Sequence, residues 1–252
     1  MIRTTNEDSV LTLELSLETN TEYILANLYA VADGLGGLED GEIASKIAIR
    51  SLSEKVLSSV LPALRTELCL PSQELIQKLL SDAVQSTNQV VFNWSQKENK
   101  RLGTTLTTLF TVGSNVVIAN IGDSRIYLLR DGVLRKLTID HSFVAGLVEK
   151  GEIKPEEVYT YPYRNIITRC LGMESNIEID LYNEEIKSGD TYLLCSDGLW
   201  EMVLDDEIHR LIEQNEDPQI ACDKLIQTAN QNGGTDNISV ILFKVLNPIF
   251  TG

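Results

Sequence analysis

The sequence contains little histidine, little cysteine and no long apolar run, and each shortage disfavours a class of protein. Its 252 residues include two histidines and four widely separated cysteines, without a Cys-x-x-Cys pair. A zinc site with the usual spacing of cysteine and histidine ligands is therefore disfavoured, and we expect the cysteines to be buried and reduced. No apolar stretch approaches the roughly 18 residues that a membrane-spanning helix needs.

Basic residues are also scarce. The chain has 21 Lys and Arg against 37 Asp and Glu, a net charge of −16. This sign repels phosphate backbones and anionic lipids, so we expect neither nucleic acid nor membrane as a partner. No basic segment followed by an apolar one opens the sequence, and we expect a cytoplasmic protein. With 43% hydrophobic residues and no recognisable linker, residues 1–252 are expected to form a single domain.

The apolar pattern of the N-terminal half indicates both strands and helices. Residues 9–15 and 23–32 alternate or run apolar in the manner of β-strands. Residues 42–61 and 72–94 carry apolar side chains at helical spacing, which predicts two long helices with one buried face each. Pro62 is expected to end the first of these helices.

The remainder of the chain favours short strands. Residues 104–137 contain four apolar runs separated by turn residues, which predicts an antiparallel meander. Further strands are expected at 177–182, 191–196 and 238–245, with helices across 205–232. We therefore predict an α+β fold in which two antiparallel β-sheets form a central sandwich flanked on both outer faces by antiparallel helix pairs. Segment 143–165 lacks a continuous apolar stripe and is expected to be a surface flap.

Aspartates stand at the ends of several predicted strands. Asp33, Asp123 and Asp197 each follow an apolar run and precede a small residue, while Asp236 and the pair Glu7 and Asp8 lie beside strand starts. One such aspartate usually marks only a turn. If the strand ends converge, however, the carboxylates repel one another and need cations to remain ionised. An all-oxygen set suits Mg²⁺ or Mn²⁺ rather than Zn²⁺ or Cu²⁺.

Other metal and nucleotide motifs fit less well. No EF-hand loop occurs, so a two-metal hydrolytic centre is preferred over a dedicated calcium loop, although calcium remains the competing ion. Gly36 and Gly41 have the spacing of two P-loop glycines, but Glu42 stands where the P-loop lysine belongs. No Gly-x-Ser-x-Gly nucleophile elbow is present, which disfavours a serine hydrolase.

Eight segments, in this order, resemble the metal-dependent type 2C serine/threonine protein phosphatases, particularly their bacterial branch. They are RTTNED (3–8), VADGLGG (31–37), GTT (103–105), IGDSR (121–125), LTIDHS (137–142), ITRCLG (167–172), CSDGLW (195–200) and GTDN (234–237). The resemblance covers nearly the whole chain. It implies the same helix-flanked sandwich and the hydrolysis of phosphoserine and phosphothreonine by a water that bridges two Mg²⁺ or Mn²⁺ ions, with a third ion in bacterial members.

The resemblance also assigns roles to residues. Asp33 would bridge two ions, the Gly34 carbonyl would bind one of them, and Asp197 and Asp236 would hold the other. Glu7 and Asp8 would act nearby, mostly through bound waters, and Asp123 would help to hold the third ion. Arg3 would bind the phosphate through its guanidinium fork. We therefore expect Arg3, Asp8 and Asp33 to take part in catalysis.

Two features depart from the family pattern. Many relatives have an additional strand segment before the residue that matches Arg3. Many also have a histidine after the first Asp-Gly, thought to protonate the leaving group, whereas this chain has Leu38 in that region. We expect His141 to be a structural residue rather than a replacement acid.

The leading hypothesis is a monomeric phosphatase that acts on phosphorylated proteins and opposes a cognate serine/threonine kinase. A phosphatase-like binding or sensing module that has lost efficient turnover is the second hypothesis, and a carboxylate-rich calcium-binding domain is the third. Metal-dependent hydrolysis of a phosphoester would separate the first hypothesis from the other two.

Overall fold

The computed structural model describes residues 5–18, 23–36, 40–66 and 71–246. Its strands are β1 (Asp8–Glu18), β2 (Tyr23–Leu35), β3 (Gly103–Thr104), β4 (Leu106–Val112), β5 (Asn115–Ile121), β6 (Arg125–Arg130), β7 (Val133–Lys136), β8 (Asp180–Glu185), β9 (Thr191–Cys195) and β10 (Val240–Lys244). Its helices are α1 (Asp40–Thr66), α2 (Gln73–Glu98), α3 (Phe143–Glu149), the 3₁₀ helix η1 (Pro155–Thr160), α4 (Asp197–Trp200), α5 (Asp205–Glu213) and α6 (Pro218–Gln231).

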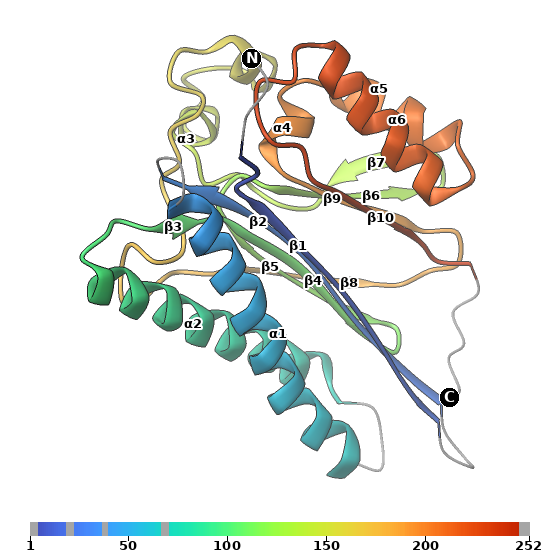
Figure 1. Cartoon of the computed structure of the whole chain (residues 1–252). Helices are drawn as coiled ribbons and strands as arrows, with labels where there is room; N and C mark the ends of the chain where they lie inside the picture. The colour runs from blue at the N-terminus through green and yellow to red at the C-terminus, as the bar shows by residue number, and fades with distance from the viewer. Residues whose placement is uncertain (1–4, 19–22, 37–39, 67–70, 247–252) are drawn as a thin grey trace.

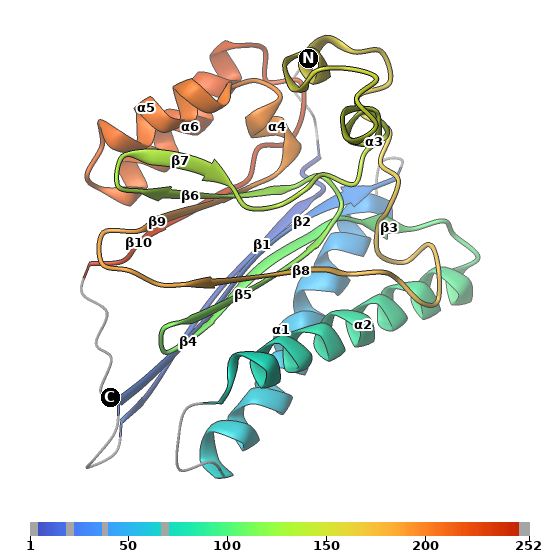
Figure 2. The same cartoon turned by 180° about the vertical axis from the view of Figure 1, so that it is seen from behind.

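The strands form two antiparallel sheets that pack face to face between two layers of helices (Figures 1 and 2). One sheet has the order β1-β2-β4-β5-β8, with the short β3 paired to β2, and the other has the order β10-β9-β6-β7. Helices α1 and α2 cover the first sheet, and α5 and α6 cover the second. The predicted α+β sandwich with helices on both outer faces is confirmed.

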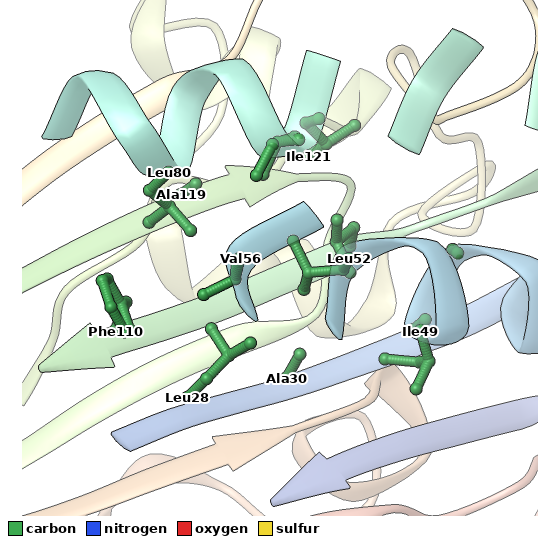
Figure 3. Close-up of a cluster of buried hydrophobic side chains, with 14 of the residues drawn as sticks. Leu28, Ala30, Ile49, Leu52, Val56, Leu80, Phe110, Ala119 and Ile121 are labelled. Carbon is green, nitrogen blue, oxygen red and sulfur yellow. The ribbon is translucent and has the colours of Figure 1, made fainter. Parts of the chain in front are cut away.

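Side chains alternate between the two faces of each strand, and the buried apolar residues form three separate layers. On β2, Leu28 and Ala30 face α1 and α2, whereas Tyr29 and Val31 face the second sheet. Figure 3 shows the layer beneath the helices, where Leu52 and other side chains of α1 lie above the first sheet. Between the sheets, the ring of Tyr29 stacks on Phe243, with 4.3 Å between the ring centroids. The third layer lies under α5 and α6 and includes Trp200.

The four strands predicted over residues 104–137 are present, but their arrangement as one meander is wrong. Strands β4 and β5 form a hairpin in the first sheet, and β6 and β7 form a hairpin in the second. The chain crosses between sheets at residues 122–124, where Gly122 has φ +107°. A Cβ at Gly122 would lie 2.5 Å from a methyl carbon of Thr105, so the crossing requires glycine there.

The predicted end of the first helix at Pro62 is also wrong, because α1 continues to Thr66. Pro62 is exposed and lies in the last turns of the helix. A proline removes one N–H donor from the backbone ladder, and here the helix continues for a further turn. Helix α2 agrees closely with its prediction and begins after Ser72, whose side chain accepts a hydrogen bond from the Leu75 amide (3.3 Å).

The segment expected to be a flap contains α3 and η1, joined and followed by turns. Its two ends are held together, because Ser142 pairs with Ile167 and the Phe143 amide donates to the Ile166 carbonyl (2.8 Å). Few of its side chains are buried; those in its two helices are Val144, Leu147 and Val158. In Figure 1 the segment stands above the end of the sandwich. Among the described helices, none combines the length and the apolar character needed to cross a membrane.

Candidate metal centre

Two acids face each other where β1 begins and β2 ends. Asp8 and Asp33 are directly opposite in the antiparallel register, which brings their Cβ atoms within about 5 Å. Asp33 continues the face of β2 that carries Tyr29 and Val31, so its carboxyl group lies at the end of the space between the two sheets. The buried stripe of the strand therefore determines where this acid points.

The second sheet contributes Asp197 at the same end. Strand β9 ends at Cys195, and Asp197 then occupies the first turn of α4. The hydroxyl of Ser196 donates to Asp8 (2.8 Å), which ties the second sheet to the first. The carboxyl groups of Asp33 and Asp197 lie within hydrogen-bonding reach of each other. Ser196 and Asp8, which are 188 positions apart in the sequence, thus meet at this end of the sandwich.

Asp123 lies in the turn by which the chain crosses from β5 to β6. Its side chain is only 2% exposed. The backbone on either side of it is fixed, because the Gly122 amide donates to His141 Nδ1 (3.1 Å) and the Trp200 indole donates to the Asp123 carbonyl (2.9 Å). The crossing that breaks the predicted meander is therefore also what brings this acid to the site.

Asp236 and Glu7 are joined through Asn237. The Asn237 side chain accepts a hydrogen bond from the Glu7 amide (2.9 Å) and donates to the Thr5 carbonyl (3.0 Å). Asp236 immediately precedes Asn237 and accepts a hydrogen bond from the Asn237 amide (2.8 Å). One amide side chain thus holds the segment before β1 beside the segment before β10.

Gly34 lies where the end of β2 meets the start of α1. A Cβ at Gly34 would lie 2.1 Å from the Gly41 carbonyl oxygen, and a Cβ at Gly41 would lie 2.8 Å from the Gly34 carbonyl oxygen and 3.1 Å from the Glu7 carboxyl carbon. No side chain fits at either position. Glycine at both positions leaves the Gly34 carbonyl close to the Glu7 carboxyl group.

Burial and mutual repulsion make these acids difficult to ionise. Burial, followed by the charges of Asp197, Asp8 and Asp123, holds the pKa of Asp33 well above its usual value. Burial and the charge of Asp123 do the same to the pKa of Asp197, and burial raises the pKa of Asp8. Burial raises the pKa of Asp123 to about 7. A cation among these groups would favour their ionised forms.

The donor atoms fit a hard divalent ion. Asp8, Asp123 and Asp197 each have one buried carboxylate oxygen that makes no hydrogen bond. Leaving these oxygens without a partner costs free energy unless a bound ion or molecule contacts them. Within the described ranges, no three His, Cys, Asp or Glu side chains lie close enough to enclose an ion by themselves. Mg²⁺ commonly uses one or two carboxylates and completes its shell with water, so the oxygen-only cluster suits such ions.

A buried ion pair between Arg125 and Asp140 lies next to the acid cluster, and its two charges offset each other. Arg125 is buried, and its guanidinium donates to both carboxylate oxygens of Asp140, at distances of 2.7 and 3.1 Å. The same guanidinium lies 3.6 Å from the centre of the Trp200 ring. Although burial raises the pKa of Asp140, the charge of Arg125 holds it below its usual value. This pair supports the Trp200 indole that binds the Asp123 backbone.

His141 is occupied on both ring nitrogens. Nδ1 accepts the Gly122 amide hydrogen, and Nε2 lies 3.1 Å from the Asp180 carboxylate and 3.0 Å from the Arg169 guanidinium. His141 is 7% exposed, and burial lowers its pKa. The His141 amide also donates to the Gly122 carbonyl (2.8 Å). These contacts fit the structural role that the sequence favours and not that of a general acid.

The structure brings together Glu7, Asp8, Asp33, Gly34, Asp123, Asp197 and Asp236 at one end of the sandwich. Arg3 and Leu38 lie outside the described residues. The sequence did not single out Asn237, Ser196 or Trp200, each of which fixes an acid or its backbone. All three lie inside the matched motifs, but nothing local indicates partners so distant along the chain.

Comparisons with known proteins give the type 2C phosphatase family that the sequence motifs resemble. A profile of the protein phosphatase 2C family matches residues 6–237. The serine/threonine phosphatase stp of Listeria monocytogenes serotype 4b is 40% identical over 214 residues, which cover 84% of this chain and 82% of that relative. The serine/threonine protein phosphatase PstP of Mycobacterium tuberculosis is 37% identical over 252 residues, which cover 98% of this chain and 43% of that longer relative.

Solved structures agree with the sequence comparisons. The crystal structure of the Mycobacterium tuberculosis serine/threonine phosphatase PstP/Ppp has a TM-score of 0.81 and 34% identity, covering 98% of this chain and 95% of that one. A structure of the PstP catalytic domain in complex with two manganese ions has a TM-score of 0.78 and 33% identity, covering 98% and 94% of the two chains. The chain therefore belongs to the protein phosphatase 2C family of metal-dependent serine/threonine phosphatases.

Proposed function

We propose that the acid cluster is the catalytic centre at which this chain hydrolyses phosphoserine and phosphothreonine in proteins. The observation that carries the proposal is the gathering of three buried carboxylate oxygens that lack hydrogen-bond donors at one end of the sandwich. Such a set is unstable by itself and suited to Mg²⁺ or Mn²⁺. When bound, these ions would lower the pKa of a water and screen the charge of the phosphate ester.

The proposed roles follow the positions of the residues. Asp33, which lies between Asp8 and Asp197, would serve two ions, with the Gly34 carbonyl as a further ligand. Asp236 and Glu7, which are held together by Asn237, would bind an ion directly or through water.

Asp123 would help to hold a third ion together with Asp197. The support for this is electrostatic, because the charge of Asp123 contributes to the raised pKa of Asp197 and both carry an unbonded buried oxygen. Two ions, and a third bound more weakly, are therefore proposed for each chain.

Arg3 is proposed to bind the phosphate. A guanidinium offers two parallel N–H donors to phosphate oxygens, and phosphoryl transfer depends mainly on positioning and charge stabilisation. Because His141 is engaged elsewhere, no histidine of the described residues is proposed as the general acid. Water is proposed to protonate the leaving alkoxide instead.

The remaining parts of the proposal concern the cellular setting. Phosphorylated proteins are the substrates, and a cognate serine/threonine kinase supplies them. We propose a monomeric, single-domain enzyme in the cytoplasm, with segment 143–165 as a flap that contacts the substrate. The excess of acidic residues favours a protein partner over a nucleic acid.

Calorimetric titration of the metal-free protein with Mn²⁺ tests the assignment of the ligands. Asp197→Asn should weaken binding by roughly tenfold or more, because it removes a charged ligand. Asp123→Ala should remove only the weakest binding step. Asp223→Asn, an exposed change of equal charge on α6, serves as the control. Wild-type Mn²⁺ binding by Asp197→Asn would refute the proposed centre, and loss of every binding step in Asp123→Ala would refute a separate third site.

A further inference from the structure

Leu35, at the end of β2 that pairs with β3, lines a hollow of about 620 Å³. Its wall is partly apolar and partly charged, and none of its residues has a role in the proposed chemistry. The residues that matter here are Leu35, Arg101, Ile167, Cys170, Met173 and Ile177. This hollow, called here the β3 hollow, has the size of a small-molecule or side-chain binding site.

The β3 hollow lies next to the strand end that carries Asp33. Leu35 lies two residues beyond Asp33 on β2 and therefore on the same face of the strand. Leu35 pairs with Gly103 of β3, and a Cβ at Gly103 would lie 2.8 Å from the Met173 side chain and 3.2 Å from Cys170 Sγ. Burial raises the pKa of the Cys170 thiol to about 11, while the charge of Arg101 opposes the rise and the charge of Asp123 adds to it.

Arg101 is the cation of the hollow that is free to bind a ligand. Its side chain is exposed, and within the described part of the chain it makes no hydrogen bond or ion pair. The other cation, Arg169, is already engaged by Asp180 (2.6 Å) and Glu178 (3.0 Å). Glu174 also lines the hollow, so recognition depends on the position of Arg101 and not on a general positive field.

The far wall of the β3 hollow is fixed before any ligand arrives. Asn88 of α2 donates to the carbonyl groups of Glu174 (2.9 Å) and Ser175 (3.2 Å). The same side chain accepts a hydrogen bond from the Gly172 amide (2.9 Å). A wall that is held in this way loses little conformational entropy when a ligand binds.

We propose that the β3 hollow binds the polypeptide next to the phosphoresidue and that Arg101 binds an anionic group of that polypeptide, either a carboxylate or a second phosphate. The apolar residues of the hollow take the flanking side chain. Arg101 then determines specificity without taking part in the chemistry. This inference rests on the proposed function, because it concerns the substrate of the same centre.

Peptide hydrolysis tests the inference. A series of phosphothreonine peptides carries glutamate, glutamine or phosphoserine at each position within roughly four residues of the phosphothreonine, a span of about 13 Å in extended chain. For the wild type, one position should show a roughly three- to tenfold higher kcat/KM with glutamate or phosphoserine than with glutamine. Arg101→Gln should remove this preference and leave the glutamine peptide unchanged.

Two controls separate a specific effect of Arg101 from a general effect of surface charge and from damage to the metal centre. Lys97→Gln removes an exposed positive charge near the end of α2, outside the β3 hollow, and should retain the preference. Hydrolysis of p-nitrophenyl phosphate reports the metal centre alone and should be the same in both variants. If the centre fails this assay, the proposed function fails, and anisotropy measurements of peptide binding still decide the inference about Arg101.

The outcomes are distinct. Preference for both anions supports a subsite for negative charge, and preference for phosphoserine alone supports a subsite for a second phosphate. A wild type that neither hydrolyses nor binds anionic peptides better than neutral ones would overturn the proposal. So would an Arg101→Gln variant that retains the preference, or a Lys97→Gln variant that loses it equally.

Discussion

At the scale of single residues, the acids of the centre differ in how they are held. Asp8 receives a hydrogen bond from Ser196, and Asp236 receives one from the Asn237 amide. Asp123 is held through its backbone, while one oxygen of its carboxyl group makes no hydrogen bond. Its position therefore depends on the groups that bind the backbone on either side, of which His141 is one.

Replacing His141 tests this dependence. His141→Leu removes the acceptor for the buried Gly122 amide and should cost about 1–3 kcal/mol in the free energy of unfolding. It should also weaken the last Mn²⁺ binding step, which depends on Asp123. His141→Asn places an amide oxygen close to the position of Nδ1 and should restore much of both losses. The measurements are thermal unfolding and calorimetric Mn²⁺ titration.

The two variants give a clear contrast. If His141 served only to fill space, leucine and asparagine would change stability without changing the binding of the last Mn²⁺ ion. Equal Mn²⁺ binding in His141→Leu and the wild type would therefore contradict the positioning role.

At the scale of elements, the crossing between sheets shows what the sequence can and cannot predict. Period-two patterns identify β2, β4 and β5 because their apolar faces are continuous. The turn at residues 122–124 has the same local signals whether it closes a hairpin or passes to another sheet. The difference is decided by packing, because Ile126 and Leu128 of β6 join the apolar layer between the sheets.

The candidate site also contains residues that the sequence predicts and residues that it does not. Acids at strand ends were visible in the sequence, because an aspartate after an apolar run marks the end of a strand. The residues that position them were not visible. Ser196 binds Asp8 across 188 residues, and Asn237 binds Glu7 across 230 residues. Such contacts depend on the topology of the whole chain and have no local signal.

The segment at 143–165 yields a prediction about local opening. Helix α3 has seven residues, and the segment is closed mainly by the pairing of Ser142 with Ile167. Few buried apolar contacts mean a low free energy of local opening. Amide hydrogen exchange should therefore be faster in α3 and η1 than in β9, whose five residues are all buried. Protection of α3 equal to that of β9 would contradict a flap.

At the scale of the whole molecule, the buried acids link stability to pH. Burial raises the pKa of Asp123 to about 7, above the value of about 3.9 expected in the unfolded chain. A group whose pKa is raised by folding stabilises the fold while it is protonated, and this stabilisation is lost as the pH rises through the folded-state pKa. The metal-free protein should therefore lose stability as the pH rises from about 4 to about 7, and the part of this loss between pH 6 and pH 7 can be measured near neutral pH.

The expected loss between pH 6 and pH 7 is roughly 1 kcal/mol from Asp123 alone, with more from the neighbouring acids. Asp123→Asn should flatten this dependence, whereas Asp223→Asn on the surface should not. Saturating Mn²⁺ should raise the melting temperature more at pH 8 than at pH 6, because ions bind the ionised carboxylates. A metal-free protein that becomes more stable across this range would contradict the electrostatic account of the cluster.

The most direct test of the central claim is the rate of phosphothreonine-peptide hydrolysis as a function of Mn²⁺ and Mg²⁺ concentration, with and without chelator. We expect activity only with added ion, complete loss with chelator and recovery on addition of excess ion. Asp33→Asn should lower the rate by roughly two orders of magnitude or more at saturating Mn²⁺, while Asp223→Asn retains the wild-type rate. Hydrolysis that resists chelation, or a wild-type rate in Asp33→Asn, would contradict the assignment of this acid cluster as the metal-dependent centre.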